Sequence, residues 1–106
     1  MDKALRISKL EEMSLKLPND PFPMYALGLE YLAEEECDKA LLFFEKLIAQ
    51  HPDYLPTYYQ MGIAFEKLNQ TKNAEDVYKK GITLAQTTRD FKTKAELEEA
   101  LSLLDD

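Results

Sequence analysis

The chain contains two versions of one stretch: MYALGLEY at residues 24–31 and YYQMGIAF at residues 58–65. They begin 34 residues apart (58 − 24), and apolar or small residues occupy equivalent positions in both. A fixed period of this length is typical of stacked helical hairpins, in which each hairpin buries its apolar face only against its neighbours. The repeat therefore predicts an all-α fold of stacked hairpins rather than one closed globule.

Apolar residues recur at spacings of three and four along most of the chain, which predicts amphipathic helices. Asp38 is expected to cap the third helix, and Thr93 the sixth in a capping box with Glu96. Gly81 is expected to weaken the middle of the fifth slightly. The expected helices span residues 2–17, 22–35, 39–50, 55–68 and 72–86, with a sixth after residue 90.

These residues resemble the tetratricopeptide repeat family, whose pattern places an aromatic residue, leucine-glycine, tyrosine, alanine, phenylalanine and proline at fixed spacings. The first copy matches six of seven positions, and the second keeps size and apolarity in six but has Gln86 at the last. Loss of that proline predicts that the fifth helix runs past the usual end. The repeat-defining core residues are Met24, Leu27, Gly28, Tyr31, Ala40, Phe44 and Pro52 in the first copy, and Tyr58, Met61, Gly62, Phe65, Ala74 and Tyr78 in the second.

The resemblance implies a right-handed α-α superhelix of about six antiparallel helices, forming a single domain over residues 1–106. Arg6 fits the pattern poorly, because it stands 34 residues before Ala40, where the pattern has a small residue. Glu96 stands where the repeats have Gly62, so the last helix is expected in a shifted register. The expected parts are an N-terminal half-repeat helix (1–20), repeat one (21–54), repeat two (55–88) and a C-terminal capping helix (89–106).

The resemblance also implies a non-catalytic module for protein-protein interaction. Such proteins hold a peptide or partner helix on a concave surface lined by the first helix of each repeat. An apolar groove with tyrosines suits an apolar segment, and an acidic rim of Glu30, Glu34 and Glu66 favours neutral or basic ones. Carried onto this chain, the groove residues are Phe22, Tyr25, Leu29, Leu32, Tyr54, Tyr59, Ile63 and Glu66.

The occupant of this groove stays open at this point. The surface is either free for another protein or peptide, or covered by the terminal helices or by a second copy of the chain in a homodimer. One specialised group in the family grips acidic chaperone C-termini with lysine, asparagine and arginine. The corresponding positions here are Tyr25, Leu29 and Gln60, so a carboxylate clamp of this kind is not expected.

The net charge and the lack of long apolar segments disfavour several classes of function. Thirteen basic and twenty acidic side chains give a formal charge of −7, which disfavours nucleic acids and anionic membrane surfaces. The first residues lack the apolar core of a signal peptide, and no apolar run is long enough for a bilayer, so we expect a cytoplasmic protein.

No residue pattern indicates an enzyme, a cofactor or a metal site. Cys37, taken as a thiol in a turn, lies among carboxylates that disfavour its thiolate form, and His51 is the only histidine. The acidic run at 34–36 lacks the alternating ligands of a calcium loop. Neither a glycine-rich phosphate loop nor a serine nucleophile motif occurs.

Overall fold

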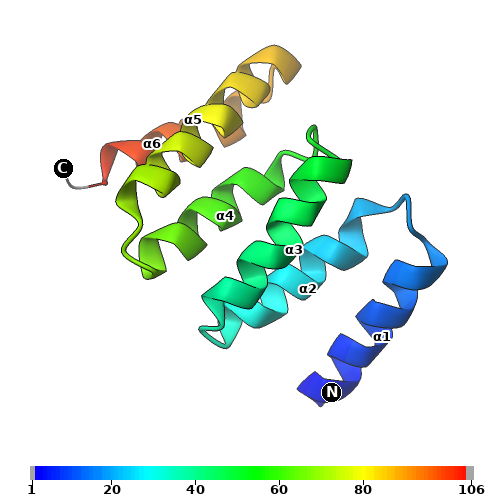
Figure 1. Ribbon diagram of the computed structural model, residues 1–106. Coiled ribbons are helices and arrows are strands. Elements are labelled where there is room, and N and C mark those ends of the chain that lie inside the picture. Colours follow the sequence, from blue (N-terminus) through cyan, green and yellow to red (C-terminus); the bar gives the residue numbers. More distant parts are fainter. Residues whose placement is uncertain (1, 105–106) are drawn as a thin grey trace. The chain divides into compact units, whose positions relative to one another are not determined.

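The computed structural model describes residues 2–104, which form six helices and no strand (Figure 1). This confirms the all-α helical fold. The helices divide between two compact units, with α1 to α3 in the unit that ends at Tyr54 and α4 to α6 in the unit that begins at Leu55. Their bounds are α1 (Lys3–Lys16), α2 (Pro21–Ala33), α3 (Cys37–Gln50), α4 (Pro56–Lys67), α5 (Thr71–Thr88) and α6 (Phe91–Ser102).

The turns after α2 and α4 share one backbone conformation. Glu35 and Asn69 both adopt left-handed φ angles, of 62° and 59°. In each turn the next N–H donates to a carbonyl five residues earlier at 2.9 Å, which satisfies a carbonyl that the helix end leaves free. These bonds run from Glu36 to Tyr31 and from Gln70 to Phe65. The 34-residue period therefore extends to the backbone hydrogen bonds.

Gly28 is the point of closest packing between α2 and α3 in the first unit. A Cβ atom on Gly28 would lie 2.8 Å from Cδ1 of Phe44 and closer still to Cε1. The phenyl ring thus occupies the space that any other side chain would need. Phe44 and its α3 neighbours Ala40 and Leu47 have no exposed surface, so the core of this unit is centred on α3.

The second unit repeats this contact and adds another. A Cβ atom on Gly62 would lie 2.7 Å from Cδ1 of Tyr78, just as Gly28 meets its ring. Three residues after Tyr78 on α5, a Cβ on Gly81 would lie 2.8 Å from Cβ of Tyr58 and 2.9 Å from Cδ1 of Leu97. Gly81 therefore allows α4 and α6 to approach α5 closely, a packing role that its helix propensity does not indicate.

Two helix caps differ from the predictions. Asp38 does not cap α3, because the helix already begins at Cys37 and Asp38 lies in its first turn, where its charge suits the helix dipole. The prediction that Thr93 caps the sixth helix in a capping box was also wrong. Asp90 caps α6 instead, accepting from the backbone N–H of Thr93 at 3.1 Å and from its hydroxyl at 2.9 Å.

The fifth helix runs on as the missing proline predicted. It comprises 18 residues, whereas α3, the equivalent helix of the first repeat, comprises 14. Arg89 ends α5 in the left-handed conformation. The sixth helix packs on it through Leu97, one residue after Glu96, and this buried leucine joins a cluster with Ala74 and Tyr78. Leu97 thus joins α6 to the core of the second unit.

Candidate interaction site

The first unit carries half of the predicted groove residues on α2. Phe22 is 51% exposed, whereas Tyr25 and Leu29 are half-buried. The ring of Tyr25 is fixed by aromatic neighbours: its centroid lies 5.4 Å from that of Tyr54 in an edge-on contact, and 6.3 Å from that of Phe44. The aromatic part of this face therefore rests directly on the core of the unit.

Leu32 does not belong to this face. It is 8% exposed, and it follows Gly28 by four residues, which places both on the side of α2 that packs against the core. The prediction that Leu32 lines the groove was therefore wrong.

Of the repeat-defining residues, Met24, Tyr31 and Phe65 are half-buried and Pro52 is exposed, whereas the others are buried.

The second unit carries three more of the predicted groove residues on α4, whereas Tyr54 is the last residue of the first unit. Tyr59 and Ile63 are half-buried, and the ring centroid of Tyr59 lies 6.2 Å from that of Tyr78. Glu66 is exposed, but its carboxylate accepts a hydrogen bond of 2.5 Å from the Tyr78 hydroxyl. Burial, reinforced by this carboxylate, raises the pKa of Tyr78 well above its usual value. Glu66 is thus committed to a contact within the unit.

The other carboxylates of the predicted acidic rim are occupied by α1. Arg6 Nε donates to Glu30 at 2.9 Å, and Lys3 Nζ lies 3.1 Å from Glu30 and 2.9 Å from Glu34. Arg6, which fits the repeat pattern poorly, thus joins α1 to α2 by charge where the repeats use a small residue. The three carboxylates therefore do not form the free acidic rim that the sequence suggested.

Glu30 makes the contact between α1 and α2 sensitive to acid. Hydrogen bonds from Arg6 and then from Lys3 hold the pKa of Glu30 below its usual value. A lowered carboxyl pKa contributes stability that is present above the unfolded-state pKa and is lost as the pH falls through the folded-state pKa. We expect Glu30→Gln to lower the urea midpoint at neutral pH, and this deficit to shrink at pH values where Glu30 itself is protonated.

The control for this variant is Glu45→Gln, which removes an exposed carboxylate from α3. It should leave the midpoint nearly unchanged at both pH values. A Glu30→Gln deficit that stays constant from neutral to acidic pH would show that the ion pair does not cause it.

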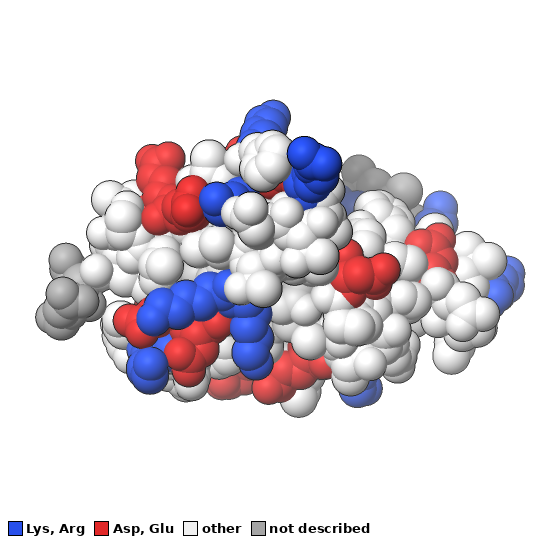
Figure 2. Space-filling model, turned by 90° about the horizontal axis from the view of Figure 1, so that it is seen from above, with Lys and Arg blue, Asp and Glu red and all other residues white. Residues whose placement is uncertain are grey.

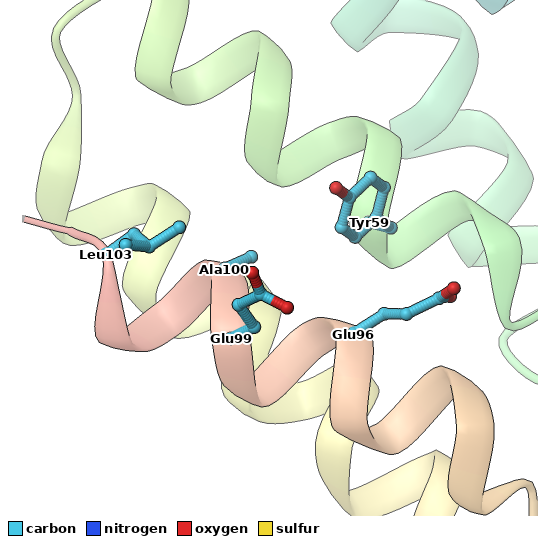
Figure 3. Close-up of a pocket in the computed structure, with 5 residues that line it drawn as sticks. All are labelled: Tyr59, Glu96, Glu99, Ala100 and Leu103. Carbon is cyan, nitrogen blue, oxygen red and sulfur yellow. The ribbon is translucent and has the colours of Figure 1, made fainter.

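A hollow lies within the second unit, between α4 and α6 (Figure 3). Its volume is about 250 Å³, and its lining comprises Tyr59, Glu96, Glu99, Ala100 and Leu103. Figure 3 shows Tyr59 projecting from α4 and the other four side chains from α6. Tyr59 was predicted to lie on the interaction surface, but no α6 residue was, because repeat spacing carries no information about a helix outside the repeats.

A second hollow, of about 410 Å³, lies at the turn between α1 and α2 and is lined by Lys16, Leu17, Pro18, Asn19 and Asp20. Figure 2 shows acidic and basic side chains interspersed on one face, with broad uncharged areas between them. Among residues 2–104, no group of three or more histidine, cysteine or acidic side chains could hold a metal ion, and no helix is both long and apolar enough to cross a membrane. Cys37 is buried as the first residue of α3 rather than lying in a turn.

The repeat pattern and the helices agree with comparisons to known proteins. Residues 55–88 match the family model described as a tetratricopeptide repeat. A tetratricopeptide repeat domain protein from Salinibacter ruber, solved in solution, is 39% identical with a TM-score of 0.77, over 83% of this chain and 89% of that one. The chain belongs to the tetratricopeptide repeat family. A crystal structure from the same organism gives 40% identity and a TM-score of 0.72, over 77% of this chain and 92% of that one.

Two further matches have lower sequence identity. The chain is 35% identical over 52 residues to the uncharacterized protein ycf37 of Guillardia theta. The aligned segment covers 49% of this chain but only 29% of that protein. A solution structure from Bordetella parapertussis has 22% identity and a TM-score of 0.81, over 92% of this chain and 85% of that one, and shows the fold alone. The tetratricopeptide repeat is in general a scaffold for protein interactions and is typically non-catalytic.

Proposed function

We propose that the partly exposed apolar faces of α2 and α4 bind a peptide or helix of another protein. The observation that carries this proposal is the stripe on α2, where Phe22 is 51% exposed and Tyr25 and Leu29 follow at three and seven residues. These spacings place the three side chains on one side of the helix. A contiguous stripe of large apolar side chains at the surface is characteristic of an interface.

The aromatic contacts favour binding because they fix the side chains in advance. Tyr25 is held by Tyr54 and Phe44, and Tyr59 is held by Tyr78. Side chains that are already ordered lose little conformational entropy when a partner covers them. Their rings offer apolar area and their hydroxyls suit the polar groups of a partner backbone. Partner binding on each face would therefore use apolar burial for affinity and tyrosine hydroxyls for orientation.

The test is selection of binders from a random peptide library displayed on phage, with the whole chain as bait. Binders selected on the unmodified protein should bind Phe22→Gln about tenfold more weakly, since burying the exposed part of a phenylalanine contributes roughly 1–1.5 kcal/mol. Affinities are measured with the selected peptides in solution by fluorescence anisotropy.

Leu42→Gln is the matched control, because Leu42 is similarly exposed but lies on α3. Its affinity for the selected peptides should equal that of the unmodified chain. Equal losses in both variants, or none in either, would contradict the proposal. Light scattering over a range of concentrations tests the alternative occupant: a dimer that Phe22→Gln dissociates would show that a second copy of the chain covers the α2 face.

A further inference from the structure

The hollow between α4 and α6 combines an aromatic ring, two carboxylates and an apolar wall. Glu96 and Glu99 lie three residues apart on α6, and both line the hollow as exposed side chains. Figure 3 shows their carboxylates pointing in different directions along α6, with Tyr59 opposite them on α4. Ala100 and Leu103 complete the lining. Because every lining residue belongs to the second unit, the geometry of this pocket is set within that unit alone.

Both carboxylates of this pocket lack a cation within the described part of the chain. Other acidic side chains of the unit have one: Glu98 lies 3.8 Å from Lys94, and Glu75 accepts from Lys79 at 3.1 Å. No ion pair joins Glu96 or Glu99 to any residue among 2–104. Two like charges that share a pocket repel each other, and a cation placed between them would relieve that repulsion. The pocket is therefore complementary to positive charge.

We propose that this pocket binds the side chain of a lysine or arginine in the partner segment. The methylene stem of such a side chain would lie against Ala100 and Leu103, as long basic side chains do on apolar surfaces. The cationic head would contact Glu96 and Glu99, and the electron-rich face of the Tyr59 ring attracts a cation as well. The inference rests on the proposed function and adds the chemistry of the residue that the partner contributes.

Two features favour a side chain over other cations and ligands. The volume of about 250 Å³ is below the roughly 300–1,000 Å³ of ordinary small-molecule sites, and suits one long side chain. A metal ion is disfavoured, since it requires three or more protein ligands of suitable type close together, and residues 2–104 bring no such group together. Anionic partners are repelled by the two carboxylates and by the net charge of −7.

The test uses acetyl-lysine methylamide as the probe and acetyl-norleucine methylamide, which has an uncharged side chain, as its control. Each is titrated into the isotopically labelled whole chain, and amide signals are followed by NMR. The lysine probe should shift the signals of Tyr59 and of residues 96–103 saturably and at least about fivefold more tightly than the norleucine probe. One molar salt should remove the difference, because charges at a surface are then screened within about 3 Å.

The decisive variant is Glu96→Gln with Glu99→Gln, which keeps the pocket shape and removes its charge. The matched control is Glu11→Gln with Glu45→Gln, which changes the net charge equally at exposed positions of the first unit. Only the first pair should abolish the preference for lysine. Equal affinity for both probes, or a preference that survives in the pocket variant, would overturn the inference.

This experiment separates the pocket from the apolar faces. If library peptides depend on Phe22 but the lysine probe shows no preference, the pocket assignment is wrong and the proposed function stands. If the lysine probe binds the pocket while no library peptide depends on Phe22, the pocket assignment stands and the apolar-face proposal is wrong.

Discussion

Replacing Phe44 with alanine should lower the free energy of unfolding by about 3–5 kcal/mol. The side chain has no exposed surface, its ring fills the space left by Gly28, and it supports the ring of Tyr25. Deleting it removes apolar burial and leaves a cavity that the close contact between α2 and α3 prevents from collapsing. Urea unfolding followed by circular dichroism gives the change.

Phe22→Ala is the control for this variant, because the same atoms are removed from a position that is half exposed. We expect a loss of less than about 1 kcal/mol there. Similar losses in the two variants would show that the core of the first unit is not centred on Phe44.

Replacing Gly62 with valine should destabilise the chain by about 2 kcal/mol or more. Two effects oppose each other: valine improves on glycine in helix propensity by a few tenths of a kcal/mol, whereas its branched side chain must enter the space of the Tyr78 ring. The clash dominates because Tyr78 is fully buried and its hydroxyl is held by Glu66, so the ring has no free direction in which to move.

Lys80→Val on α5 gives the comparison, since it introduces valine at an exposed position of a helix in the same unit. It should change the stability by no more than about 0.5 kcal/mol. A second comparison is Gly62→Val combined with Tyr78→Leu, in which the smaller side chain should recover part of the loss. Full additivity of the two substitutions would contradict a direct clash.

Much of the fold could be predicted because it depends on short-range patterns. Spacings of three and four mark the six helices, and prolines mark the starts of α2 and α4. The 34-residue period makes Gly62 equivalent to Gly28 and Tyr78 equivalent to Phe44. Replacement of the final proline by Gln86 likewise indicated a longer fifth helix. Each of these features depends on residue spacing along the chain, so a single sequence is enough to predict it.

Apart from the two helix caps, the errors concern contacts between helices that the repeat pattern does not describe. Arg6 reads as a misfit in a repeat, but its partner Glu30 lies 24 positions away. Gly81 reads as a weak point in a helix until Leu97 is seen against it. Leu32 belongs to a broad apolar surface of α2, and only its burial distinguishes core from interface.

The sequence by itself therefore determined the helices, the repeat and the family, because helix periodicity and a fixed repeat length are written in the order of the residues. Tertiary structure alone decided which carboxylates are free. Lys3 pairs with Glu30 and Glu34, and Arg6 also pairs with Glu30. The Tyr78 hydroxyl donates to Glu66, whereas Glu96 and Glu99 line a pocket with Tyr59. Charge is visible in a sequence, but whether a charge is paired depends on which side chains packing brings within a few ångströms of it.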